Sequence, residues 1–68
     1  MMNCLRDLRR QRGLSQADLA EAIEVSRQTI NAVEADKYDP SLPMAYMLAS
    51  FFDVPVEELF YNPYRAQG

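Results

Sequence analysis

The chain has 68 residues, of which 49% are hydrophobic and 25% are charged, as in an ordinary globular protein. A single domain of this length buries only about 60% of the surface that its unfolded form exposes, which leaves little room for a deep catalytic pocket. It has no histidine, two glycines and one cysteine, Cys4, so neither a metal cluster nor a glycine-rich phosphate loop can be assembled from these residues. We therefore expect no enzyme activity and no cofactor.

The expected location is the cytoplasm. No apolar run approaches the roughly 18 residues that span a membrane. The N-terminal stretch MMNCLRDLRR lacks the apolar segment of a signal peptide. A lone cysteine cannot form an internal disulfide, which fits a reducing compartment.

The net charge of −3 is unevenly distributed along the chain. Residues 1–14 carry four arginines against one aspartate, a net +3, and Arg27 and Lys37 follow within acidic surroundings. A weakly acidic protein can bind nucleic acid if its few cations converge on one face. Arg6 and Arg12 could equally belong to a solvated helix face. The charge predicts modest affinity and moderate salt sensitivity.

Apolar spacing and capping residues predict five short helices, over residues 3–12, 16–23, 27–34, 43–52 and 56–61. The first has Leu5 and Leu8 inside and ends at Gly13. The second begins after Ser15, whose hydroxyl can accept an orphan backbone N–H, and Asp18 favours the positive helix end.

Serines also precede the third and fourth helices. Ser26 caps the third, in which Ile30 would face inward, while Ser41 caps the fourth, with Pro43 in its first turn. The segment VPVEELF predicts a short last helix, and no segment alternates like a strand. The connection between the second and third helices is so short that they must cross steeply, which is helix-turn-helix geometry.

The segment LRRQRGLSQADLAEAIEVSRQTINAVEADKYDPSL resembles the Cro/C1-type (XRE family) helix-turn-helix regulators, in their compact stand-alone form. The resemblance runs from Leu5 to about Phe60 and keeps the spacing of Gln16, Ala20, Val25, Ile30 and Glu34. It implies an all-α, five-helix, lambda-repressor-like DNA-binding domain over residues 1–68. The helix-turn-helix would cover about 16–34, and a C-terminal tail would cover 61–68.

The resemblance also implies a DNA-binding surface. In the family the third helix lies in the major groove with its first residues at base edges. Arg27 and Gln28 are then the expected base readers, since arginine suits guanine and glutamine suits adenine, and Asn31 reaches either a base or a phosphate. Gln16 would contact phosphate and brace the third helix. The other phosphate contacts implied are Ser26, Lys37 and Tyr38.

Two further structural features follow from the resemblance. Arg9 and Glu34 would form a bidentate ion pair that ties the recognition helix to the first helix. Relatives commonly carry glycine where this chain has Glu24, Asp36 and Asp53, at helix ends that favour a left-handed backbone.

Aromatic residues near the C-terminus exceed what one small core needs, and exposed apolar surface usually marks a contact. We expect a two-fold homodimer through Phe60, Tyr61 and Tyr64, acting as a repressor on a palindromic DNA operator. The alternative is a protein-interaction module, such as an antitoxin or an antagonist of another regulator, for which the acidic surface and aromatic tail argue. DNA binding requires Arg27, Lys37 and the first-helix arginines to share a face.

Overall fold

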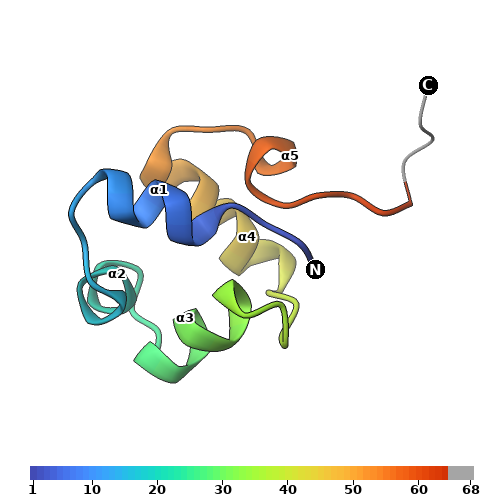
Figure 1. Cartoon of the computed structure of the whole chain (residues 1–68). Helices are drawn as coiled ribbons and strands as arrows, with labels where there is room; N and C mark the ends of the chain where they lie inside the picture. The colour runs from blue at the N-terminus through green and yellow to red at the C-terminus, as the bar shows by residue number, and fades with distance from the viewer. Residues whose placement is uncertain (65–68) are drawn as a thin grey trace.

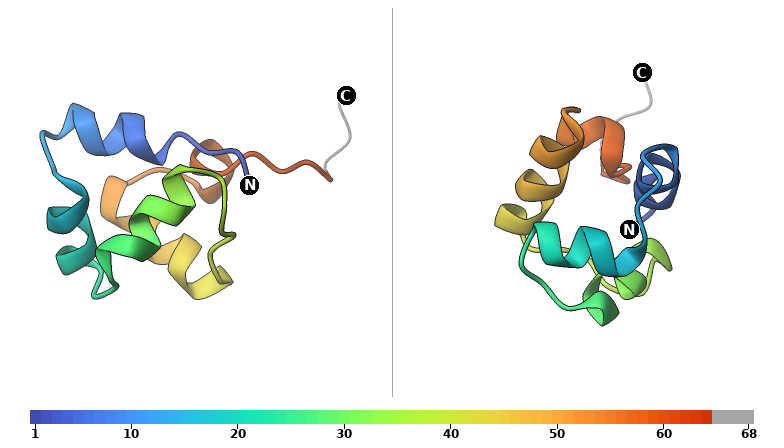
Figure 2. Two further views of the ribbon diagram at one scale, coloured as in Figure 1. Left: turned by 60° about the horizontal axis from the view of Figure 1, so that its bottom comes forward. Right: turned by 90° about the vertical axis from the view of Figure 1, so that its left-hand side faces the viewer.

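A computed structural model of the chain describes residues 1–64 (Figure 1). These residues form five helices, α1 (Leu5–Gln11), α2 (Gln16–Ala22), α3 (Arg27–Glu34), α4 (Leu42–Phe52) and α5 (Val56–Leu59). Helices α2 and α3 lie below α1, α4 and α5 in the view of Figure 1, and the right-hand view of Figure 2 shows α1 and α4 on opposite sides of the molecule. The all-α fold and the helix-turn-helix in α2 and α3 are as predicted.

Three of the helices begin at serines that satisfy backbone N–H groups. The Ser15 hydroxyl accepts from the Asp18 N–H at 2.9 Å, and the Asp18 carboxylate accepts from the Ser15 N–H at 2.9 Å, which makes a reciprocal capping box. These bonds favour the charged carboxylate and hold the pKa of Asp18 below its ordinary value. Ser26 and Ser41 each accept the backbone N–H three residues on, so all three predicted serine caps are confirmed.

Helices α1 to α4 are followed by residues in the left-handed conformation. Gly13 has φ +68°, Glu24 and Asp36 have φ +61°, and Asp53 has φ +56°. At each of them two backbone hydrogen bonds close the turn in the Schellman pattern. The left-handed residue donates its N–H to the carbonyl three residues back, and the next residue donates its N–H to the carbonyl five residues back. The left-handed backbone expected at Glu24, Asp36 and Asp53 is therefore confirmed, and Gly13 adopts it as well.

The core lies between the helices and draws on all five. Its fully buried side chains are Leu5, Leu19, Ile30, Val33, Leu48 and Leu59. Ala20 is 3% exposed on α2, and its small side chain allows α3 to approach closely. Among residues 1–64, no helix is both long and apolar enough to cross a membrane.

The chain ends differ from the prediction, because α1 and α5 are both shorter than expected. Asn3 and Phe60 form an isolated antiparallel bridge, with the Cys4 N–H donating to the Leu59 carbonyl at 3.0 Å and the Tyr61 N–H to the Met2 carbonyl at 2.8 Å. This pairing holds both segments extended. The bridge carries the Phe60 side chain into the core, where it is 4% exposed. Phe60 is therefore a core residue, and its expected part in a dimer contact stays a prediction.

Candidate nucleic-acid interface

Helix α3 separates apolar from polar residues. Ile30 and Val33 are fully buried in the core. Arg27, Gln28 and Asn31 are exposed. The structure thus places the three predicted base readers on the solvent side of one helix, two of them in its first turn.

An ion pair fixes this helix to the scaffold. Arg9 Nε lies 2.7 Å from Glu34 Oε2 and Arg9 Nη2 lies 3.1 Å from Glu34 Oε1, so the pair is bidentate as the resemblance implied. The Arg9 Nη1 group also donates to the Leu14 carbonyl at 2.8 Å. The Glu34 side chain is fully buried, and Arg9 is 8% exposed. One guanidinium therefore joins α1, the connection to α2, and the last turn of α3.

Both members of this pair are charged near neutral pH. Burial raises the pKa of Glu34, but hydrogen bonds from Arg9 and Gln16 outweigh it, and the net pKa lies below the ordinary value. The hydrogen bond between Arg9 and Glu34 also raises the pKa of Arg9. Arg6 Nε approaches the carboxylate from the solvent side at 3.4 Å. Near neutral pH the Glu34 carboxylate therefore acts only as a hydrogen-bond acceptor.

Gln16 links this buried carboxylate to the exposed face of α3. Its Nε2 atom donates to Glu34 Oε1 at 3.1 Å, and its Oε1 atom accepts from Asn31 Nδ2 at 3.4 Å. Gln16 is half-buried, whereas Asn31 is exposed. The side chain that the resemblance gave as a brace for α3 therefore contacts two of its residues.

The other implied phosphate contacts flank α3. Ser26, which precedes the helix, has its hydroxyl 2.8 Å from the Thr29 hydroxyl. Lys37 and Tyr38 follow the helix, and both are exposed. The Lys37 N–H donates to the Ala32 carbonyl at 2.9 Å, which fixes the start of this loop against α3.

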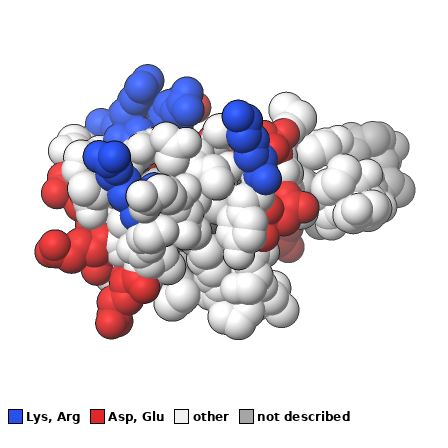
Figure 3. Space-filling view, turned by 90° about the horizontal axis from the view of Figure 1, so that it is seen from below, with Lys and Arg blue, Asp and Glu red and all other residues white. Residues whose placement is uncertain are grey.

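The face that carries α2 and α3 is mixed in charge (Figure 3). Lys and Arg side chains gather in the upper half of this view, while acidic side chains lie at the left, lower left and right. This face therefore carries cations and carboxylates side by side.

The arginine that directly follows α1 has a role that the sequence did not indicate. Arg12 donates to the carbonyls of Phe51 at 3.0 Å and Phe52 at 3.1 Å, at the C-terminal end of α4. Its guanidinium carbon also lies 5.1 Å from the centre of the Phe52 ring. A cation at the negative end of a helix and over an aromatic face is favourable on both counts. Arg12 therefore joins α1 to α4, and no local sequence signal indicates partners 39 and 40 residues away.

Known proteins resemble this chain in sequence. Residues 5–59 match the helix-turn-helix family HTH_3. An uncharacterized HTH-type transcriptional regulator of Methanocaldococcus jannaschii is 50% identical over 60 residues, covering 88% of this chain and 91% of the relative. A second such regulator, of Archaeoglobus fulgidus, is 40% identical over 60 residues, covering 88% and 86%.

A phage repressor also matches most of this chain in sequence. The cryptic phage CTXphi transcriptional repressor RstR of Vibrio cholerae is 40% identical over 55 residues, which are 81% of this chain and 50% of the repressor. These matches are to regulators rather than enzymes, in agreement with the expectation from the side-chain inventory. The chain belongs to the Cro/C1-type (XRE) helix-turn-helix family of DNA-binding transcriptional regulators.

Proposed function

We propose that this chain is a sequence-specific repressor that binds double-stranded DNA as a homodimer, with α3 in the major groove. The observation that carries the proposal is the anchoring of α3. Its apolar side is buried in the core, its last turn is held by the Arg9–Glu34 pair, and its polar side is exposed. Because its orientation is already fixed, α3 can present its polar side chains to the groove without a further ordering cost.

The proposed contacts divide into base readers and phosphate binders. Arg27 would pair with guanine O6 and N7, and Gln28 with adenine N6 and N7, each through two hydrogen bonds. Phosphate contacts would come from the residues at the start of α2 and at both ends of α3, namely Gln16, Ser26, Lys37 and Tyr38. Such contacts set the register on the duplex and carry no sequence information.

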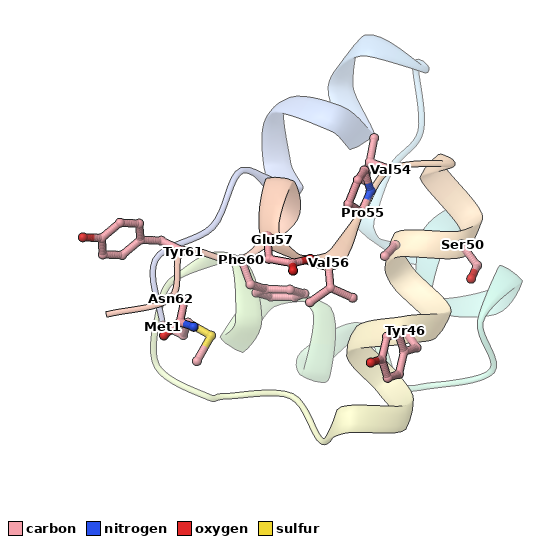
Figure 4. Close-up of a pocket in the computed structure, with 11 residues that line it drawn as sticks. Met1, Tyr46, Ser50, Val54, Pro55, Val56, Glu57, Phe60, Tyr61 and Asn62 are labelled. Atoms are coloured by element: carbon pink, nitrogen blue, oxygen red, sulfur yellow. The ribbon is translucent and has the colours of Figure 1, made fainter. Parts of the chain in front are cut away.

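Support for a homodimer comes from apolar surface around α4 and α5. A groove of about 630 Å³ lies between them, with Tyr46, Val56 and the edge of Phe60 facing it (Figure 4). Tyr61 is 49% exposed and Tyr64 is 90% exposed. Exposed aromatic surface of this kind is typical of a protein contact. A two-fold dimer would present two copies of α3 to successive major grooves.

Support for repression comes from the family. RstR is by its name a transcriptional repressor, and it matches this chain through the helix-turn-helix region. A chain that occupies a palindromic operator blocks other proteins from the same DNA. The remainder of the expected tail, residues 65–68, lies outside the described residues.

Selection from a randomised duplex pool, followed by fluorescence anisotropy on the enriched sequence, tests DNA reading. We expect a palindrome with half-sites about 10 base pairs apart. Arg27→Ala combined with Gln28→Ala should abolish the preference for it, since each bidentate pair contributes about 1–3 kcal/mol of discrimination. Arg27→Lys is the matched control, because it keeps the charge and the salt dependence but cannot form the planar pair with guanine.

No enrichment at low salt would contradict DNA reading. The protein-interaction alternative, an antitoxin or an antagonist of another regulator, would then be the better hypothesis and a pull-down the next step.

Sedimentation at micromolar concentration tests the homodimer. Tyr61→Ala combined with Tyr64→Ala should shift the protein toward a 7.8 kDa monomer. Tyr38→Ala is the control, because it removes an exposed tyrosine from the loop after α3 and should leave the dimer intact while weakening DNA binding. A wild-type protein that sediments as a clean monomer would contradict the dimer.

A further inference from the structure

The hydrogen bonds that run from Glu34 to Asn31 have a defined direction. The Glu34 carboxylate is paired with Arg9, so it is charged and can only accept. Gln16 must therefore turn its NH₂ group toward Glu34, at the observed 3.1 Å, and its oxygen away from it. The orientation of this amide is thus decided by its chemical surroundings, and the reversed amide would place two oxygens together.

The same reasoning extends to Asn31. The Gln16 oxygen can only accept, so Asn31 presents its NH₂ group to it, with Nδ2 at 3.4 Å. One N–H of Asn31 is used in this way. The second N–H and the Oδ1 atom stay available on an exposed side chain of α3.

A free donor beside a free acceptor matches one base edge in the major groove. Adenine offers the N7 acceptor and the N6 donor, whereas guanine offers two acceptors at N7 and O6. An amide held in this direction by Gln16 is complementary to adenine and opposes one acceptor of guanine with its own oxygen. The discrimination follows because Asn31 cannot be reversed without losing its bond to Gln16.

We infer that Asn31 reads an adenine, and that Gln16 is the positioning residue that sets the direction of its amide through Glu34. The inference deepens the proposed function and rests on it, since it assumes that α3 enters the major groove. It assigns Asn31 a base and gives Gln16 a part in specificity besides phosphate binding.

The test measures base preference at every position of the enriched duplex, by competition anisotropy with single-base-pair variants. Wild type should prefer A·T at one position of each half-site by about 5- to 150-fold, which corresponds to one bidentate pair. Asn31→Ala should reduce that preference to about threefold or less and leave the other positions unchanged. Gln28→Ala is the matched control and should relax a different position.

Two further variants distinguish base contact by Asn31 from positioning of its amide by Gln16. Asn31→Asp carries only acceptors and should move the preference at the same position toward cytosine, whose N4 group donates. Gln16→Ala should relax that position as well, beyond any uniform loss of affinity from a missing phosphate contact. Thermal unfolding of each variant establishes that the fold is retained.

The outcomes are distinct. If wild type enriches a site but Asn31→Ala leaves every base preference unchanged, the adenine assignment is overturned and the proposed function stands. A Gln16→Ala variant that weakens all sites equally, with the adenine preference intact, overturns the positioning role. No enrichment by wild type overturns the proposed function together with the inference.

Discussion

Replacing Glu24 by glycine should stabilise this protein. Glu24 follows α2 with φ +61°, a conformation that residues with a side chain adopt at a cost. The fold imposes it, because the Glu24 N–H donates to the Glu21 carbonyl at 3.2 Å and the Val25 N–H to the Ala20 carbonyl at 2.9 Å. These two bonds direct the chain from α2 into α3.

The magnitude follows from two opposing contributions. A side chain in the left-handed region costs about 1–2 kcal/mol, which glycine removes. Glycine also gives the unfolded chain more freedom, which costs about 0.4–1 kcal/mol. The Glu24 side chain is exposed, so little packing is lost. The net gain is about 0.5–1 kcal/mol, or about 2–8 °C in the melting temperature of a domain of this size.

Thermal and urea unfolding followed by circular dichroism measures the gain. Glu24→Ala is the control, because it removes the same charge but keeps the Cβ atom, and it should show little of the gain. Gly13→Ala is the reverse experiment. Gly13 has φ +68° and an added Cβ would meet no atom within 4 Å, so about 1 kcal/mol should be lost through the backbone alone. A melting temperature that is unchanged or lowered in Glu24→Gly, or raised equally in Glu24→Ala, would refute the reasoning.

Three other expectations concern the core and its ion pair. Arg9→Ala should cost about 3–5 kcal/mol in urea unfolding, because it leaves the buried Glu34 carboxylate without its partner, and a replacement of both residues by apolar ones should cost less. Leu48→Ala should cost about 2–5 kcal/mol, since Leu48 is 0% exposed, and a loss below 1 kcal/mol would place that side chain outside the core. The pKa of Glu34 is depressed in the folded state, so its stabilisation is present above pH 4.5 and is lost as the pH falls through the folded pKa. Glu34→Gln should therefore flatten the loss of stability in acid, and equal slopes for the two proteins would contradict this.

Some features of the candidate site could be predicted from the sequence and others could not. The exposed positions of Arg27, Gln28 and Asn31 follow from helical spacing once Ile30 and Val33 are assigned to the core. The Arg9–Glu34 pair could be named only through the resemblance to known regulators, since 25 residues separate its members. The direction of the Gln16 amide could not be predicted, because it depends on which atoms surround the buried carboxylate.

The local features could be predicted from short segments of the sequence. The serine caps and the inward residues of each helix depend on hydrogen bonds or contacts that span four or five residues. The left-handed helix ends at Glu24, Asp36 and Asp53 were expected only through the resemblance to relatives that carry glycine there. Two contacts depend on how the helices pack: Arg12 reaches the end of α4, and Asn3 pairs with Phe60, whose ring then lies in the core. These contacts join segments that are distant in the sequence, and they form because packing the five helices brings the segments together. No periodicity or capping signal contains that information.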